Sequence, residues 1–302
     1  MLSNLESAYR VCEQITQTYA KNFFYAFRVL PKEKRSAIYV VYAFCRMCDD
    51  IADGSLPNQT KFDKLEEIAE FFKTPTNKSV SSESPIFLAL HDVIIKYKIP
   101  KNYFTEFIDG MIMDQTMNRY SDFSELELYC HKVASVVGLI CIEIFGYKNK
   151  SKNVFTSADK LGIAMQLTNI IRDIKEDIKR NRIYIPESDL SKFGYTETQL
   201  KESVYNKRFC SLMEFQTQRI RSLFNASLEL DQLINEDSRS CIKILRSLYL
   251  KILYKIEASG YDLYGPKISL TKKEKIETMV KLWIHHIGIN FTNKLKSLII
   301  NG

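Results

Sequence analysis

Apolar residues recur along this chain at the three- and four-residue spacing of a single helix face. The segment near the C-terminus shows the pattern plainly, with apolar residues at Ile276, Val280, Trp283, Ile287 and Phe291. This spacing predicts amphipathic α-helices, and no segment alternates between apolar and polar residues as a half-buried strand does. The pattern therefore predicts an all-α fold.

Helices are expected over most of the chain, with ends marked by proline and glycine. Pro31 suits a first helical turn, Gly146 and Gly260 suit C-terminal caps that need a positive φ, and Pro186 follows a helix end. The expected helices cover residues 4–20, 32–54, 61–73, 85–97, 101–118, 122–146, 154–181, 197–204, 207–234, 238–260 and 271–300.

The chain is expected to form one domain over residues 1–302. With 302 residues, 45% of them hydrophobic, it can bury a substantial core. The polar segment 74–85 resembles a linker, but few helices precede it, so we interpret it as a surface loop. No repeat of fixed period and no low-complexity tail is visible.

Targeting signals are weak in this sequence. The longest apolar stretch, Val133–Ile142, is far shorter than the roughly 20 residues of a membrane-spanning helix, so none is expected. The N-terminus lacks the basic-then-apolar order of a secretory signal, which favours a cytoplasmic protein with seven reduced cysteines. The basic segment 271–300 could make peripheral contact with a membrane, although core packing explains the same apolar stripe.

The net charge of +7 suits an anionic partner: nucleic acid, a membrane surface or a phosphorylated small molecule. The lysines are dispersed, and no helix-turn-helix or aromatic-basic module stands out. Nucleic acid is therefore the least favoured of the three.

Two acidic segments narrow the choice. Asp49 and Asp53 end an apolar helix one turn apart on the same face, and Asn169, Asp173 and Asp177 repeat the same four-residue step. Ligands that are all oxygen atoms fit Mg²⁺, which is commonly bound by one or two carboxylates while substrate phosphates complete its shell. Either segment alone is more often a solvated helix face, but two together favour a metal site.

An arginine accompanies each acidic segment. Arg46 lies one turn before Asp50, and Arg172 adjoins Asp173. A guanidinium group can hold two diphosphate oxygens at once, so metal and arginine together suit a departing diphosphate. The same arginines could instead neutralise aspartates at the surface.

The residues around these motifs resemble the two signatures of the squalene and phytoene synthase family. The resemblance is carried by Tyr42–Asp53 and Gln166–Asp177. It continues through Tyr19–Tyr25, Asp109–Asp114, Tyr129–Leu139, Arg180–Pro186 and Gly260–Tyr264. It implies a single-domain isoprenoid-synthase helical bundle around a central cavity, and a Mg²⁺-dependent prenyltransferase.

The resemblance also implies roles for individual residues. Up to three Mg²⁺ ions would be bound by Asp49, Asp53, Asn169, Asp173 and Asp177. Diphosphate groups would be held by Lys21, Asn22, Arg46, Arg172, Tyr249 and Lys267, the last standing where arginine is usual. The catalytic residues would be Tyr42, Tyr129 and Arg172. The cavity wall would include Phe23, Phe27, Tyr42, Val133, Val137, Gly138 and Gln166.

The reaction implied is the head-to-head condensation of two prenyl diphosphates to a cyclopropylcarbinyl diphosphate. Residues 129–147 and 260–271 look closest to bacterial presqualene diphosphate synthases, which predicts farnesyl diphosphate as substrate. The alternatives are phytoene synthesis from geranylgeranyl diphosphate and, in another class, a non-catalytic helical scaffold. NADPH use stays open, because squalene synthases of this family lack a dinucleotide fingerprint. Nothing indicates the oligomeric state.

Overall fold

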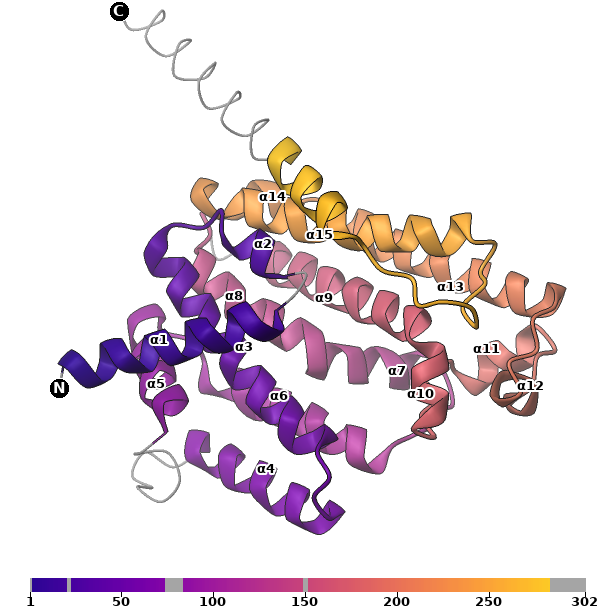
Figure 1. Cartoon of the computed structure of the whole chain (residues 1–302), viewed down its shortest axis with the longest axis horizontal. Coiled ribbons are helices and arrows are strands. Elements are labelled where there is room, and N and C mark those ends of the chain that lie inside the picture. The colour runs from indigo at the N-terminus through magenta and orange to yellow at the C-terminus, as the bar shows by residue number, and fades with distance from the viewer. Residues whose placement is uncertain (1, 21–22, 74–83, 149–151, 283–302) are drawn as a thin grey trace, which may run out of the picture.

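In the computed structural model the chain forms a bundle of α-helices (Figure 1). The structure describes residues 2–20, 23–73, 84–148 and 152–282. Over these ranges it has no β-strand, and only one isolated antiparallel bridge joins Tyr147 to Ile234. The helical elements are α1 (Leu2–Tyr19), α2 (Phe23–Phe27), α3 (Lys32–Asp53), α4 (Asn58–Lys73), α5 (Pro85–Tyr97), α6 (Lys101–Thr116), α7 (Phe123–Cys130), the π-helix η1 (His131–Ser135), α8 (Val136–Phe145), α9 (Lys152–Arg172), α10 (Ile174–Lys179), α11 (Glu187–Lys192), α12 (Glu197–Lys201), α13 (Lys207–Ala226), α14 (Leu230–Leu233) and α15 (Glu236–Ala258).

The predicted all-α fold is confirmed, and α5 has the predicted bounds. Two predicted helices are each divided in the structure: residues 154–181 break at Asp173, and residues 207–234 break between α13 and α14. The short helices α2 and α11 were not predicted. The expected helix 271–300 is helical over residues 272–282, and the rest lies outside the described residues, as do Lys21 and Asn22.

Helix α3 runs through the middle of the bundle and packs against α1, α5, α6 and α8. Phe44 on this helix meets Phe72 and Phe104 edge-on, with ring centroids 5.6 Å apart in each pair. Edge-to-face aromatic pairs contribute beyond their buried area, so this cluster fixes α3 in the core. The acidic end of α3 is thereby held in place.

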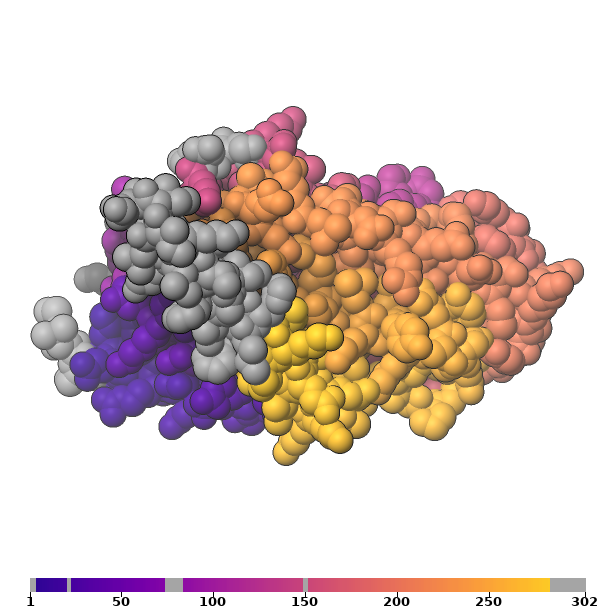
Figure 2. All heavy atoms as spheres, turned by 90° about the horizontal axis from the view of Figure 1, so that it is seen from above, coloured from indigo at the N-terminus to yellow at the C-terminus, as the bar shows by residue number. Residues whose placement is uncertain are grey.

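One face of the bundle is formed by the C-terminal third of the chain. Helix α15 packs against α2, α9 and α13. In the view from above, the orange and yellow atoms of α13 to α15 and of the residues that follow up to 282 form a continuous surface over the middle and right of this face (Figure 2). This layer therefore closes the space between α9 and the N-terminal helices.

A π-turn interrupts the long helix Phe123–Phe145. Two glycines of neighbouring helices pack against it: a Cβ on Gly110 would lie 2.8 Å from Val133 Cγ1, and one on Gly162 would lie 2.5 Å from Ser135 Cα. The π-turn adds a residue to one turn and so shifts the phase of the helix. The side chains on both sides of it therefore line one cavity, described below.

This same helix is long and apolar enough to cross a membrane by length and composition, and is the one such helix in the described part of the chain. The sequence pattern predicted no such helix, because Ser135 and Gly138 interrupt its apolar run. Half of its most apolar stretch is buried inside the bundle. Packing against α6 and α9 accounts for its apolar character.

The close approach at η1 predicts that Gly162→Ala destabilises the fold. The added methyl group would push against the backbone of Ser135, and overpacking of this kind costs about 1–3 kcal/mol. Gly138→Ala is the matched control, because its Cβ would meet only Ala158 O at 3.8 Å. In urea unfolding, equal free energies of unfolding for the two variants would contradict this account.

Candidate active site

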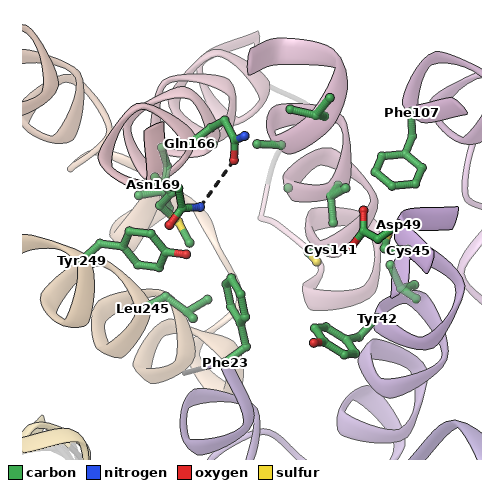
Figure 3. Close-up of a pocket in the computed structure, with 18 of the residues that line it drawn as sticks. Phe23, Tyr42, Cys45, Asp49, Phe107, Cys141, Gln166, Asn169, Leu245 and Tyr249 are labelled. Atoms are coloured by element: carbon green, nitrogen blue, oxygen red, sulfur yellow. Dashed lines mark hydrogen bonds between the residues drawn. The ribbon is translucent and has the colours of Figure 1, made fainter. Parts of the chain in front are cut away.

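A cavity of about 660 Å³ lies at the centre of the bundle (Figure 3). Side chains from α2, α3, α6, α8, α9 and α15 line it. The predicted residues that it brings together are Phe23, Phe27, Tyr42, Arg46, Asp49, Asp53, Tyr129, Val133, Val137, Gly138, Gln166, Asn169, Arg172, Asp173 and Tyr249. Asp177 and Lys267 do not line it.

The cavity has a charged end that is open and an apolar end that is closed. Along α3 its lining changes from Ile38 to Asp49 and Asp53, and along α9 from Ala158 to Asp173. The Asp53 side chain is 47% exposed, whereas Ile38 is 1% exposed. Such a cavity suits a ligand with an anionic head and a long hydrocarbon tail.

Asp49 is the most enclosed carboxyl group at the charged end. Burial raises the pKa of Asp49 to about 7; the Arg46 charge opposes the shift, whereas Asp53, Asp50 and Asp114 add to it by repulsion. Three carboxylates and one guanidinium group therefore act on this buried side chain.

Arg46 offers an unused hydrogen-bond donor to the cavity. Its guanidinium donates to Asp50 at 2.5 Å and lies 4.8 Å from the centre of the Tyr19 ring. Its Nε atom is buried and has no hydrogen-bond partner. A buried donor without a partner is costly, so this atom calls for an acceptor such as a diphosphate oxygen.

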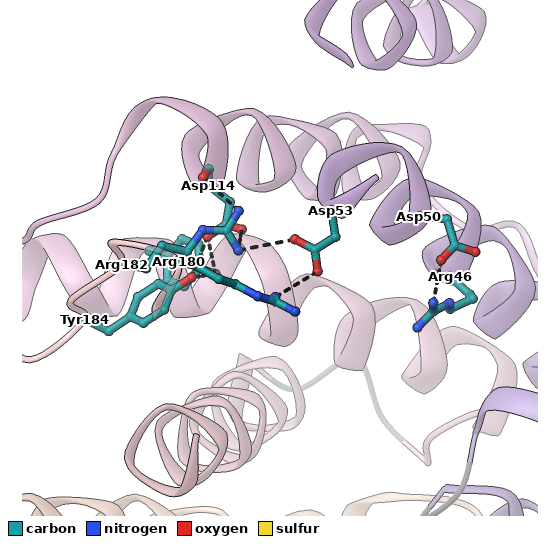
Figure 4. A network of polar contacts seen from close by, with 8 residues as sticks. Arg46, Asp50, Asp53, Asp114, Arg180, Arg182 and Tyr184 are labelled. Carbon is teal, nitrogen blue, oxygen red and sulfur yellow. Dashed lines mark hydrogen bonds and ion pairs between the residues drawn. The ribbon is translucent and has the colours of Figure 1, made fainter. Parts of the chain in front are cut away.

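Two arginines beyond the second acidic motif hold the first (Figure 4). Arg180 and Arg182 each lie 3.3 Å from a carboxylate oxygen of Asp53, and Arg182 also lies 2.8 Å from Asp114. The Arg182 and Asp114 side chains are only 16% and 11% exposed. These ion pairs bring the end of α3 to the segment that follows α10.

Asp114 also accepts two phenolic hydrogen bonds. Tyr184 donates to it at 2.6 Å and Tyr129 at 3.0 Å, and the two rings stack with centroids 5.2 Å apart. Burial and the Asp114 charge raise the pKa of Tyr129 well above its ordinary value. The Tyr129 hydroxyl therefore keeps its proton and acts as a donor.

Asp114, Arg182 and Tyr184 line the cavity, but no role was predicted for them. The available signal was indirect: they lie in the segments Asp109–Asp114 and Arg180–Pro186, which carry part of the family resemblance.

The second acidic motif is more fully neutralised than the first. Arg172 donates to Asp173 from Nε at 2.9 Å, and Lys267 lies 2.6 Å from the same carboxylate. Burial opposes ionisation of Asp173, but Arg172 and Lys267 outweigh it and lower the pKa. Lys267 is thus placed beside this motif without lining the cavity.

The helix changes direction at Asp173 yet keeps its four-residue step. Asp173 N donates to Asn169 O at 2.8 Å, and Asp177 N donates to Asp173 O at 3.0 Å. Burial raises the pKa of Asp177 to about 7, and the Asp173 charge adds to the shift. The predicted polar stripe is therefore present. Asp177 does not line the cavity, but the charges of Arg182, Arg180 and Asp114 act on its carboxyl group.

The wall opposite Asp49 is aromatic. The Phe23 ring lies 6.0 Å from Phe27, 6.1 Å from Tyr249 and 6.4 Å from Tyr42, measured between centroids. Burial raises the pKa of Tyr249, against the lowering effects of the Arg172 charge and an Asn169 hydrogen bond. Two phenylalanine rings and two phenols thus border the space between the two acidic motifs.

The donor set fits a metal that arrives with its substrate. No three acidic, histidine or cysteine side chains in the described ranges converge closely enough to hold a metal ion. Mg²⁺ is usually bound by one or two carboxylates with phosphate oxygens completing its octahedron. Asp49 and Asp53 on one side, and Asn169 and Asp173 on the other, could supply those protein ligands.

The fold and the cavity define a helical bundle whose central cavity joins a charged end to an apolar interior. Its neighbours among solved structures have the all-α isoprenoid-synthase fold. A dehydrosqualene synthase in complex with ligand is similar with a TM-score of 0.84 and 28% identity, covering 94% of this chain and 98% of that one. The squalene synthase HpnC from Alicyclobacillus acidocaldarius is similar with a TM-score of 0.77 and 26% identity, covering 85% and 95%.

Sequence comparison identifies the family. Residues 16–274 match the family described as squalene/phytoene synthase. A phytoene synthase of Mycobacterium bovis is 35% identical over 280 residues, covering 91% of this chain and 90% of the relative. A phytoene synthase of Arthrospira platensis is 34% identical over 271 residues, covering 86% and 87%. The chain therefore belongs to the squalene/phytoene synthase family, as its motifs predicted.

The raised pKa of Asp49 predicts that removing the charge of this side chain stabilises the folded state. Because the folded pKa of about 7 exceeds the ordinary 3.8, the folded state holds the proton more tightly and loses stability as pH rises between these values. In EDTA, the Asp49→Asn variant should therefore have a higher free energy of unfolding than the parent. This advantage should be larger at pH 8 than at pH 5, by about 1–3 kcal/mol.

Thermal and urea unfolding at the two pH values would measure this difference. Asp63→Asn is the control, because Asp63 lies exposed on α4 and accepts only from Gln59. A pH-independent effect at Asp49 would contradict the assigned charge environment.

Proposed function

We propose that this protein condenses two molecules of geranylgeranyl diphosphate head to head, releasing diphosphate and leading to phytoene. The observation that carries the proposal is the single cavity that joins two acidic motifs at an open end to a closed apolar interior. The names of the sequence relatives support geranylgeranyl diphosphate over the farnesyl diphosphate predicted from residues 129–147 and 260–271.

The carboxylates and Asn169 at the cavity mouth would hold Mg²⁺ between the protein and the substrate. Bound there, Mg²⁺ would act as a Lewis acid toward the departing diphosphate. Asp49 and Asp53 would serve one side, and Asn169, Asp173 and Asp177 the other.

Basic side chains at the mouth would bind the diphosphate groups directly. Arg46 has a free donor in Nε, and Arg172 and Lys267 can turn from Asp173 to phosphate oxygens. Fixed positive charge that meets developing negative charge accelerates diphosphate departure.

The apolar interior would protect the allylic cation that remains. The carbon–oxygen bond breaks with its electron pair leaving on diphosphate, and the double bond of the second substrate attacks the cationic carbon. Loss of a proton from the new cation to the released diphosphate closes the cyclopropane ring. The second diphosphate then leaves with its electron pair, and loss of a second proton from the rearranged cation gives phytoene. Phe23, Phe27 and Tyr42 present ring faces to this space, and a desolvated cation–π contact contributes up to about 2 kcal/mol. Tyr129 has one phenolic proton, which it donates to Asp114, so it would bind a diphosphate oxygen as a donor only by turning from that carboxylate.

Condensation of farnesyl diphosphate is the second candidate. The specific observation that favours it is the similarity to the dehydrosqualene and squalene synthase structures. Both candidates use the same mouth and the same first condensation. They differ in the length of tail that the interior must accept.

Product analysis tests the proposal. Purified protein would be incubated with farnesyl or geranylgeranyl diphosphate, with Mg²⁺ or EDTA and with or without NADPH, and products identified by mass spectrometry. We expect phytoene from geranylgeranyl diphosphate with Mg²⁺ alone. Asp49→Ala and Asp173→Ala should abolish it, because each removes a proposed metal ligand.

Presqualene diphosphate, squalene or dehydrosqualene from farnesyl diphosphate would instead support the second candidate. No turnover by folded protein under any of these conditions would favour a non-catalytic scaffold.

The Asp114 network predicts a loss of activity in Asp114→Asn. The substitution keeps the side-chain volume but removes the charge that Arg182, Tyr129 and Tyr184 share. A hydrogen bond to a charged group contributes about 1.5–3 kcal/mol, so kcat/KM should fall about tenfold or more.

Asp109→Asn is the control for this variant. Asp109 lies on the same helix and pairs with Lys132 at 3.0 Å, but its side chain is 55% exposed. Equal losses of kcat/KM in the two folded variants would show that the Asp114 network has no special role.

A further inference from the structure

The closed end of the cavity is made by residues that lie outside both acidic motifs and for which no role was predicted. Phe145 of α8, Leu230 of α14 and Ile242 of α15 line it there, and they are 3%, 1% and 3% exposed. They come from three different helices. No charged group of either acidic motif is among them.

The backbone carbonyl group of Phe145 is held by Lys34, which also forms an ion pair with Asp237; we call these contacts the Lys34 clamp. Lys34 of α3 donates from Nζ to Phe145 O at 2.7 Å and to Asp237 Oδ1 at 2.7 Å. Ser238, which is fully buried, also donates to Phe145 O at 3.4 Å. The Lys34 side chain is 17% exposed, whereas that of its partner Asp237 is 44% exposed.

The turn after Phe145 fixes the same end of α8. Gly146 has φ of +71°, and a Cβ there would lie 2.3 Å from Asn235 Nδ2, so this position requires glycine. Asn235 N donates to Gly146 O at 3.0 Å, and Tyr147 pairs with Ile234. The end of α8 is thus tied to the chain between α14 and α15.

We infer that Phe145, with Leu230 and Ile242, is the floor that limits the length of the prenyl tail, and that Lys34 positions it. This inference rests on the proposed function and deepens it. Side chains that close an apolar pocket decide which tails fit, because a tail that is too long meets them and one that is too short leaves a void.

The length of the cavity wall agrees with a four-isoprene tail. At about 1.5 Å per residue, Tyr129 at the charged end and Phe145 at the closed end lie about 24 Å apart along the helix. An extended isoprene unit has four carbon–carbon bonds and spans about 5 Å, so geranylgeranyl and farnesyl tails span about 20 Å and about 15 Å. The geranylgeranyl tail therefore ends about 4 Å from the floor and the farnesyl tail about 9 Å from it, so the longer tail fits this length better.

Substrate competition tests the floor. The parent, Phe145→Ala, Phe145→Leu and Leu230→Ala would be assayed with farnesyl, geranylgeranyl and geranylfarnesyl diphosphate. We expect the floor variants to raise kcat/KM for the longest substrate relative to geranylgeranyl diphosphate by about tenfold, the scale of one methylene in a tight pocket. The milder Phe145→Leu keeps the test valid if Phe145→Ala does not fold.

Phe209→Ala is the matched control, because Phe209 is fully buried but does not line the cavity. It should affect all three substrates alike. A chain-length ratio that is unchanged in every folded floor variant overturns the inference.

Lys34 is tested as a positioning residue. Lys34→Met should raise kcat/KM for geranylfarnesyl diphosphate relative to geranylgeranyl diphosphate, while kcat for geranylgeranyl diphosphate is retained. Lys34→Arg should restore part of the selectivity. A purely structural role would lower stability and slow all three substrates equally, which would refute the clamp.

Failure of the proposed function gives a different result. If the parent turns over none of the three substrates, the proposed function is wrong. The floor is then tested by binding, measured as the shift in melting temperature that each of the same diphosphates causes. A changed chain-length ranking in the floor variants supports the inference, and an unchanged ranking or no binding overturns it.

Discussion

Keeping like-charged carboxylates inside an apolar bundle is the constraint on which the rest of this structure depends. Burial raises the pKa of Asp49 and of Asp177 to about 7. A buried charge without a partner is strongly destabilising, so cations must stand close by. Arg182 joins Asp53 to Asp114, and Arg172 and Lys267 pair with Asp173. The bundle tolerates these groups because α3 and its aromatic neighbours supply a large apolar core.

The same helices that carry the charges also build the hydrocarbon interior. In α3 and α9 one face points into the cavity throughout, and only its last turns are acidic. A helical repeat of 3.6 residues places Ile38 and Asp49 on that one face, about three turns apart. One side of each helix can thus present carboxylates at the mouth and apolar side chains farther in.

Local spacing made part of this site predictable from the sequence. Asp49, Asp53 and Asp173 follow a four-residue step that survives in the structure, and the helices around them follow the apolar period. The role of Asp114 was not predictable, since its partners Tyr184 and Arg182 come from a distant segment. The π-turn at His131–Ser135 packs closely against glycines of two other helices. Its own sequence therefore does not predict it.

The two acidic motifs could not decide between farnesyl and geranylgeranyl tails, for a structural reason. The motifs gather at the mouth, where both substrates present the same diphosphate and the same allylic carbon. The closed end is set by Phe145, Leu230 and Ile242, and by the Lys34 contacts that hold Phe145. Mouth and floor belong to the same helices but to opposite ends of them. Substitutions at the floor can therefore change the substrate while the chemistry at the mouth is preserved.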